Sequence, residues 1–177
     1  MVLVGCAGLP QPTGFPLSKS ADAFSFSGRI AVRERERNLS GGILWRHDAS
    51  RDEILLTSPL GQGVAQLTRD ADGAVLRTAD GEEYRAGDAE DLAWRVTGWR
   101  IPVDGLAFWL RGSARSGSVA GEERDPQGRL LRLAQDDWMI EFTAYFAPPE
   151  DRLPRRMVLT RPEFEMKLII DQWDHAQ

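Results

Sequence analysis

The stretch Phe24-Ser25-Phe26-Ser27-Gly28-Arg29-Ile30-Ala31-Val32 alternates between two kinds of side chain along most of its length. Phe24, Phe26, Ile30 and Val32 fall on one side of an extended chain, whereas the serines and the arginine fall on the other. A period of two residues is typical of a β-strand with one buried face and one face in water. The stretch therefore predicts a half-buried strand in an antiparallel sheet.

Segments of the same kind follow in two groups, separated by a short region with helical spacing. The first group lies at Leu39 to His47, Asp52 to Ser58, Val64 to Arg69, Ala74 to Thr78 and Glu83 to Ala86, and the second at Leu130 to Gln135, Trp138 to Tyr145, Arg156 to Arg161 and Phe164 to Trp173. Short polar connections between such segments are typical of an antiparallel meander. We expect a mainly β (α+β) fold, a curved antiparallel sheet of about ten or eleven strands.

Two helices are expected between the groups of strands. The first runs from about Asp88, a good N-cap residue, to Trp99, with Leu92 and Val96 on one apolar face. The second is short and runs from about Leu106 to Arg111. We expect both helices to lie over the concave side of the sheet, because each has an apolar face to bury.

A curved sheet covered by helices is able to hold an apolar cavity, because its concave face supplies a row of inward side chains. A close-packed core would use the same residues, and periodicity does not decide between the two. The candidate lining residues are Ile30, Ile43, Trp45, Leu55, Trp138, Ile140, Phe142, Leu168 and Ile170 from the strands, and Leu92, Val96, Trp99, Trp109 and Leu110 from the helices.

A leucine stands at the tip of a predicted turn that follows an apolar strand. Pro59 sets the backbone for a turn, and Gly61 permits a positive φ, so Leu60 is expected to project from the bend. Either Leu60 folds back onto the core, or it stays in water and serves a function there. Single exposed apolar residues usually need no explanation, so the turn alone leaves both readings open.

Composition excludes several classes of function. A chain of 177 residues with 42% hydrophobic and 28% charged residues suits a globular domain, and its net charge of -5 argues against nucleic acid as a partner. The sequence has no nucleophile elbow, no phosphate-binding glycine motif and no metal-spaced cluster around its two histidines. We therefore expect no enzyme, no metal and no cofactor, although a catalytic carboxylate pair formed in space stays open.

Cys6 is the single cysteine, so no internal disulfide can form. The surrounding residues 3–8 resemble a bacterial lipobox, in which the cysteine receives a lipid. Fewer residues precede it than a signal segment needs, so either the start is truncated or Cys6 is unmodified. We expect lipidation, with residues 1–23 forming a lipobox-like N-terminus and a flexible tether, and residues 24–177 forming one lipoprotein-binding domain.

Several short segments, in their order and spacing, are similar to one known family. They are Phe26 to Val32, Leu44 to His47, Leu56 to Gly61, Thr78 to Gly81 with Tyr84, Asp88 to Leu92, Thr97 to Val103 leading to Leu106 and Trp109, Leu153 to Arg156, and Lys167 to Trp173. Together they resemble the LolB family of outer-membrane lipoprotein receptors, over most of the chain. The resemblance implies an incomplete β-barrel closed by helices around a cavity for acyl chains.

The same resemblance implies a function. The family accepts acylated lipoproteins from the periplasmic carrier LolA and inserts them into the outer membrane. It implies that Cys6 is the lipid anchor, that Pro59, Leu60 and Gly61 form a membrane-insertion loop, and that the chain is a monomer at the periplasmic face of the outer membrane. The implied partners are LolA, the acyl chains of cargo lipoproteins and the inner leaflet of the outer membrane. A soluble LolA-like carrier, a lipid hydrolase and a passive structural lipoprotein stay as alternatives.

Overall fold

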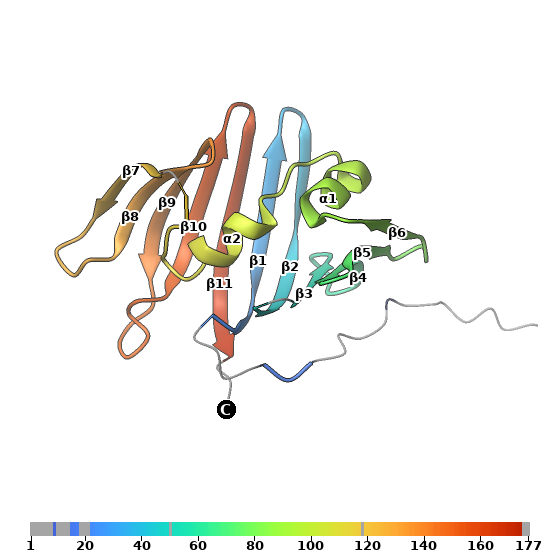
Figure 1. The fold of residues 1–177 in the computed structure, drawn as a ribbon, viewed down its shortest axis with the longest axis horizontal. Coiled ribbons are helices and arrows are strands. Elements are labelled where there is room, and N and C mark those ends of the chain that lie inside the picture. The colour runs from blue at the N-terminus through green and yellow to red at the C-terminus, as the bar shows by residue number, and fades with distance from the viewer. Residues whose placement is uncertain (1–8, 10–14, 18–21, 50, 118, 175–177) are drawn as a thin grey trace, which may run out of the picture. The chain divides into compact units, whose positions relative to one another are not determined.

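The computed structural model describes Leu9 and residues 15–17, 22–49, 51–117 and 119–174 (Figure 1). Cys6, and with it the expected lipobox, lies outside the described residues. The strands are β1 (Phe24–Glu34), β2 (Arg37–Asp48), β3 (Arg51–Thr57), β4 (Gly63–Asp70), β5 (Gly73–Thr78), β6 (Glu83–Ala86), β7 (Val119–Arg124), β8 (Leu130–Gln135), β9 (Trp138–Tyr145), β10 (Pro154–Arg161) and β11 (Phe164–Asp174). The helices are α1 (Ala89–Thr97) and α2 (Val103–Trp109).

The strands form one 11-stranded sheet in the order β6-β5-β4-β3-β2-β1-β11-β10-β9-β8-β7. Strands β2 to β6 pair antiparallel, one with the next, and so do β7 to β11. The order ends at β6 and at β7, so the sheet is not closed. The predicted mainly β fold with a long antiparallel sheet and two helices is thus confirmed.

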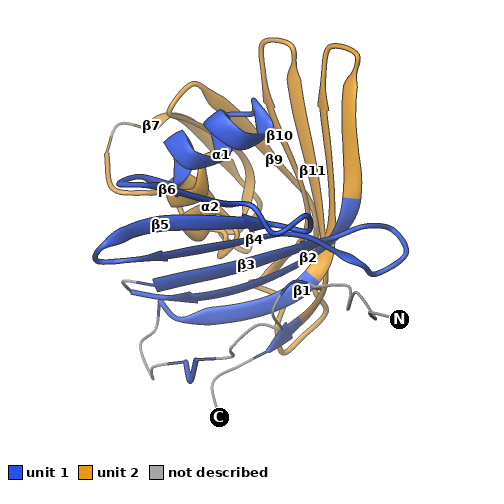
Figure 2. Cartoon of the chain, turned by 90° about the vertical axis from the view of Figure 1, so that its right-hand side faces the viewer, with its two compact units in different colours: residues 1–27, 41–101, 173–177 blue, residues 28–40, 102–172 orange. Residues whose placement is uncertain are grey.

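The chain divides into two compact units, which Figure 2 shows in different colours. Unit 1 comprises residues 1–27, 41–101 and 173–177, and unit 2 comprises residues 28–40 and 102–172. In each unit one face of the sheet carries the large buried apolar side chains, and we call it the inner face. The opposite face is the outer face.

The inner face of unit 1 is rich in aromatic side chains. Phe24 and Phe26 of β1 alternate toward it as the sequence predicts, and both are buried. The ring of Phe24 lies 5.8 Å from that of Trp45, and the ring of Phe26 lies 5.3 Å from that of Trp173. Aromatic pairs at such distances gain energy beyond the area that they bury. This cluster joins β1, β2 and the end of β11 in unit 1.

Helix α1 belongs to unit 1 and contacts β5 and β6. Its N-cap is Asp88, whose carboxylate accepts a 2.8 Å hydrogen bond from the backbone nitrogen of Asp91. Gly98 ends the helix in the left-handed conformation, with a φ of 72° that costs glycine little. The helix is therefore slightly shorter than predicted, and Trp99 lies just beyond its end.

Helix α2 belongs to unit 2 and begins and ends earlier than predicted. It starts at Val103, directly after Pro102, and ends at Trp109. Gly105 allows the Trp109 ring to approach, because a Cβ atom at this glycine would lie 2.6 Å from the ring. The inner face of unit 2 is formed by buried side chains of β8 to β11, among them Leu133, Ile140 and Leu159, which lie opposite one another in register.

Candidate functional site

The connection between β3 and β4 presents a leucine to solvent. Leu60 is 88% exposed, whereas Leu56 before the loop is half-buried and Val64 after it is 39% exposed. The backbone closes tightly around it: Gly61 donates a 2.9 Å hydrogen bond to the carbonyl of Ser58, and Ser58 donates one of 2.7 Å to the carbonyl of Gln62. Gly61 adopts a φ of 81°. The predicted exposed turn is therefore present, and Leu60 does not fold back onto the core.

The hydroxyl of Ser58 holds this loop from within. Its Oγ atom accepts hydrogen bonds of 3.3 Å from the backbone nitrogens of both Leu60 and Gln62. A serine side chain that bonds backbone groups two and four residues ahead fixes a turn locally. The sequence pattern does not identify Ser58 as a functional residue, although serine is common at the first position of a turn. The loop thus presents Leu60 on a defined backbone.

The lining residues predicted in unit 1 occupy two different environments. Ile43, Trp45, Leu92 and Trp99 are buried, and Val96 is half-buried. Leu55 is misplaced in the prediction. It pairs with Leu44, while its neighbour Ile54 pairs with Trp45, so Leu55 lies on the outer face and Ile54 takes the inner position. The run Ile54-Leu55-Leu56 is apolar throughout, so alternation within β3 did not reveal which face each residue occupies.

The lining residues predicted in unit 2 are all buried. They are Ile30, Trp109, Leu110, Trp138, Ile140, Phe142, Leu168 and Ile170. Ile140 is flanked across the sheet by Leu133 and Leu159, and Phe142 lies opposite Met157. Trp138, Ile140, Phe142, Leu168 and Ile170 therefore belong to a buried apolar layer on β8 to β11, as the alternation in the sequence predicts.

A buried carboxylate lies among the apolar residues of unit 1. Asp52 is fully buried, and its Oδ1 atom accepts a 2.8 Å hydrogen bond from Nε1 of Trp45 and lies 2.7 Å from Nδ1 of His47. Arg69 forms an ion pair with its other oxygen. Burial opposes ionisation, but the hydrogen bond and charge of His47, the charge of Arg69 and the Trp45 hydrogen bond outweigh it, so the pKa of Asp52 is lowered.

A second polar group fastens α2 inside unit 2. The Oε1 atom of Gln135 accepts hydrogen bonds from Nε1 of Trp109, at 3.0 Å, and from the backbone nitrogen of Arg115, at 2.9 Å. Its Nε2 atom donates to the carbonyl of Arg115 at 2.8 Å. The amide therefore ties together the end of α2, the following loop and β8. Gln135 shares the inner face with Leu133, so α2 reaches that face.

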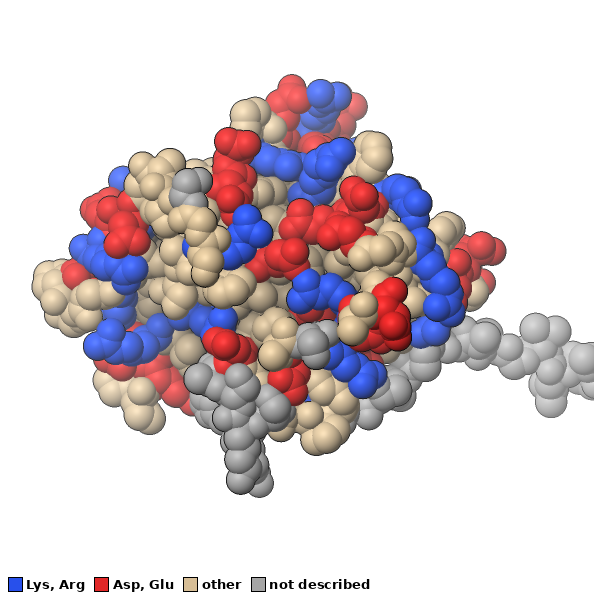
Figure 3. Space-filling view, viewed as in Figure 1, with Lys and Arg blue, Asp and Glu red and all other residues tan. Residues whose placement is uncertain are grey.

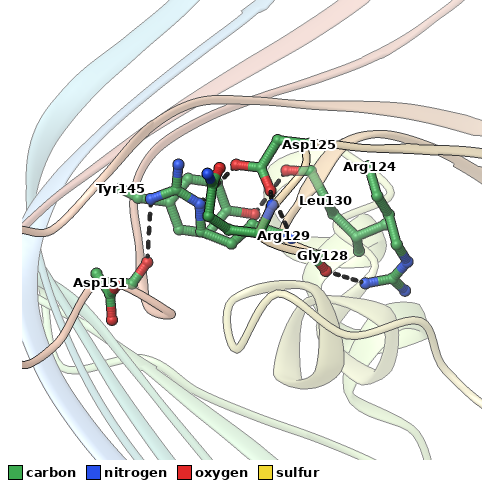
Figure 4. Close-up of polar contacts among 8 residues, drawn as sticks. Arg124, Asp125, Gly128, Arg129, Leu130, Tyr145 and Asp151 are labelled. Atoms are coloured by element: carbon green, nitrogen blue, oxygen red, sulfur yellow. Dashed lines mark hydrogen bonds and ion pairs between the residues drawn. The ribbon is translucent and has the colours of Figure 1, made fainter.

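Figure 4 shows a third polar cluster, where β8 begins and β9 ends. The hydroxyl of Tyr145 donates a 2.6 Å hydrogen bond to the carbonyl of Leu130, and the Arg129 guanidinium lies 4.9 Å from its ring centroid. Arg129 also donates to Asp125 at 2.6 Å. Burial raises the pKa of Tyr145 to about 12, so the phenol stays protonated at physiological pH. These contacts stabilise the turn before β8.

A shallow pocket of about 520 Å³ lies on unit 2 near the turn between β8 and β9. Ala134, Met139 and Thr160 line it from the outer face, with Asp136, Asp137 and Arg161 at the turns. Trp138 is the one predicted lining residue among those that border it. The pocket therefore lies mainly on the outer face and borders the inner face only at Gln135 and Trp138.

The charged side chains do not form a patch of a single sign. Figure 3 shows basic and acidic groups interspersed over the face that it draws. Among the residues that the structure describes, no group of three or more His, Cys, Asp or Glu side chains is placed to hold a metal ion. Within the same part of the chain, no helix is long and apolar enough to cross a membrane.

Comparison with known proteins gives matches along nearly the whole chain. A family model described as "LolB: Outer membrane lipoprotein LolB" matches residues 22–173. The outer-membrane lipoprotein LolB of Nitrosomonas europaea is 39% identical over 98% of this chain and 88% of its own length. That of Thiobacillus denitrificans is 37% identical over 98% and 92%. Among solved structures, a LolA superfamily protein from Nitrosomonas europaea has a TM-score of 0.49 at 8% identity, with 86% of each chain covered.

Proposed function

Because this chain belongs to the family of outer-membrane lipoproteins called LolB, we propose that it accepts acylated lipoproteins from the periplasmic carrier LolA and inserts them into the outer membrane. The resemblance seen in the sequence is thereby confirmed as a family relationship. The receptor role is favoured over that of a soluble carrier, since the relatives are named as outer-membrane lipoproteins.

The exposed leucine is the observation that supports insertion most directly. Leu60 is 88% exposed on a loop whose backbone is closed by its own hydrogen bonds. Full burial of a leucine side chain gains about 1.5 to 3 kcal/mol, which is enough for transient contact with a bilayer and too little for anchoring. We propose that Pro59, Leu60 and Gly61 enter the membrane surface when cargo is released.

The apolar inner faces support a role in lipid binding. Each methylene of an acyl chain gains about 0.8 kcal/mol on burial, so a chain of about fourteen methylenes represents about 11 kcal/mol. That cost is too large for the lipid to cross water during transfer. We propose that the acyl chains displace part of this buried packing and then lie against side chains such as Trp45 and Val96 in unit 1 and Ile140 and Trp109 in unit 2.

Transfer then needs no chemical step. It proceeds if the receptor binds the acyl chains more tightly than the carrier does and less tightly than the bilayer does. The absence of a phosphate-binding motif from the sequence agrees with transfer that uses no nucleotide. We further propose that a lipid on Cys6 holds the receptor at the periplasmic face of the outer membrane.

A transfer assay tests this proposal. Purified LolA carrying a labelled lipoprotein is mixed with this chain, without nucleotide, and the two proteins are separated to read which one holds the label. The expected result is movement of the label to this chain, and from there to added liposomes. Label that stays on LolA would contradict the receptor role and leave the passive structural lipoprotein. Release of free fatty acid from an ester substrate would point to the hydrolase instead.

A further inference from the structure

The outer face of unit 1 holds polar groups that are covered, although such a face is normally wet. Glu53 pairs with Arg46, and Gln66 with Leu55, so these side chains share the face opposite Trp45. Glu53 is 1% exposed and Gln66 is 3% exposed, and the Gln66 amide donates a 2.9 Å hydrogen bond to the Glu53 carboxylate. Polar side chains on the outer face of a single sheet layer normally stay in water, so this burial is unusual.

Two described residues of the N-terminal segment, which comprises residues 1–23, make contacts on this face. Nη2 of Arg46 donates a 2.8 Å hydrogen bond to the carbonyl of Phe15. The guanidinium carbon of Arg51 lies 4.7 Å from the centroid of the Phe15 ring, and that of Arg46 lies 5.6 Å from it. A ring within about 6 Å of a guanidinium group gains cation–π energy. Phe15 is therefore held where β2 ends and β3 begins.

Leu9 makes the second contact, at the other end of β3. Its Cδ1 atom lies 3.0 Å from the position that a Cβ atom on Gly63 would take. Gly63 pairs with Thr57, the last residue of β3, and directly follows the loop that carries Leu60. Glycine at this position leaves room for the leucine side chain. Leu9 is half-buried, as expected for a side chain packed on one side.

The spacing of the two contacts matches the strand that they flank. Leu9 and Phe15 are six residues apart, and an extended chain of six residues reaches about 20 Å. Arg51 and Thr57 are also six residues apart and mark the two ends of β3. A strand of this length likewise spans about 20 Å. The N-terminal segment thus has the length to join both contacts along the outer face.

We propose that the N-terminal segment docks on the outer face of unit 1 through Leu9 and Phe15, and so brings the lipid anchor into the membrane beside Leu60. This inference rests on the proposed function. Cys6 precedes Leu9 by three residues, and Leu60 precedes Gly63 by three, and such a stretch reaches at most about 11 Å. The lipid on Cys6 and the side chain of Leu60 are therefore expected to enter one phospholipid surface close to each other.

Docking raises the frequency with which the loop that carries Leu60 contacts the bilayer. If residues 7–23 formed a free tether, the domain would turn in all directions around its anchor. A docked segment leaves only the residues between Cys6 and Leu9 as a linker. The effective concentration of a tethered group falls steeply as its linker lengthens. Leu60 on the docked protein is therefore held near the membrane throughout each cycle of cargo transfer.

The single cysteine allows a direct test in solution. The full, unlipidated chain is labelled with a nitroxide on Cys6, and broadening of backbone amide signals is read by NMR. We expect strong broadening at Leu60, Gly61 and Gln62. The double variant Leu9→Ser/Phe15→Ser should lose most of it, whereas Pro16→Ser, a change at an exposed residue of the same segment, should keep it. Absence of broadening in the native chain, or no loss in the double variant, would overturn the docking.

A second experiment, on vesicles, distinguishes a failure of this inference from a failure of the proposed function. Each variant is coupled through Cys6 to a maleimide phospholipid in vesicles of phosphatidylethanolamine and phosphatidylglycerol, and delivery of labelled lipoprotein is timed. Docking predicts several-fold slower delivery by the double variant, with unchanged acceptance from LolA. Equal rates would refute the role of docking and leave the receptor function standing. Normal delivery by Leu60→Glu would instead refute the insertion role, whatever the NMR result.

Discussion

The indole nitrogen of Trp45 donates a hydrogen bond to the carboxylate of Asp52, and both side chains are buried on the inner face of unit 1. An ionised group in such a place is stable only if charges and donors surround it. Here His47 and Arg69 complete the set. The inner face that we assign to acyl chains therefore also holds a buried, ionised carboxylate, which connects β2, β3 and β4.

Asp52→Asn should destabilise the protein at neutral pH. Asparagine keeps an oxygen for Trp45 but removes the charge that pairs with Arg69. Hydrogen bonds to charged groups contribute about 1.5 to 3 kcal/mol, so we expect a loss of about 2 kcal/mol in the free energy of unfolding, measured with urea. Asp70→Asn, an exposed residue at the end of β4, is the control and should change it by less than about 0.5 kcal/mol.

The same variant should show a defined pH dependence. The pKa of Asp52 is lowered in the folded protein from an ordinary value of 3.8, so its ionisation stabilises the fold above that value. As the pH falls below about 3.8, the unfolded chain takes up the proton first, and the stabilisation is lost toward the lower folded pKa. The gap between native and Asp52→Asn stability should therefore narrow in acid. A constant gap from pH 7 to pH 3 would contradict this assignment.

Gly28→Ala should strongly destabilise unit 2. A Cβ atom at Gly28 would lie 2.3 Å from the carbonyl oxygen of Ile169, a backbone atom that cannot move without shifting its strand. Such overpacking costs about 1 to 3 kcal/mol or more. Gly121→Ala is the matched control, because no atom lies within 4 Å of its Cβ position. Thermal melts should separate the two variants clearly, and equal melting temperatures would contradict the close approach.

Gln135→Leu should loosen α2 and the loop after it. The change removes three hydrogen bonds and leaves the Trp109 indole and the Arg115 backbone without these partners. Each unsatisfied buried group costs about 1 to 3 kcal/mol, so we expect a total of about 3 kcal/mol and faster hydrogen exchange at the Arg115 amide. The control is Gln127→Leu, at an exposed turn residue. If both variants exchanged at the native rate, Gln135 would not hold this segment.

Val96→Glu should weaken lipid binding in a folded protein. Val96 is half-buried on α1, so a charge there is tolerated in water but opposes an acyl chain. We expect at least about a tenfold loss of affinity for a fluorescent fatty acyl probe, about 1.4 kcal/mol. Met139→Glu adds the same charge on the outer face of unit 2, where Met139 pairs with Ala134. Unchanged probe affinity in folded Val96→Glu would refute the role of this surface.

Local patterns predicted most strands because each was decided by its own alternation. The bounds of β8 and β9 agree with the prediction residue for residue, and those of β6 do as well. The sequence pattern does not predict strand β7, because all six of its residues are exposed and carry no apolar alternation. It is a strand only because β8 offers it a partner, which is information from a distant part of the chain.

The wrong face predicted for Leu55 and the missed contacts of Leu9 and Phe15 likewise depend on parts of the chain that are distant in sequence. Leu55 was assigned to the inner face, but the pairing of Ile54 with Trp45 and with Leu67 sets the register of β3 and turns Leu55 outward. Leu60 could be predicted because its turn residues are adjacent to it. The contacts of Leu9 and Phe15 could not, since a Pro/Gly-containing N-terminus gives no periodic signal for the face on which it lies.

Delivery of cargo by Leu60→Glu is the measurement that tests the central claim most directly. LolA loaded with labelled lipoprotein is mixed with native chain, with Leu60→Glu or with Met139→Glu, and transfer is followed first to the receptor and then to liposomes. Both variants should fold and accept cargo as the native chain does, because Leu60 and Met139 are exposed. Only Leu60→Glu should lose most delivery, since a charged side chain cannot enter the bilayer surface as leucine does. Native delivery by Leu60→Glu would contradict the account.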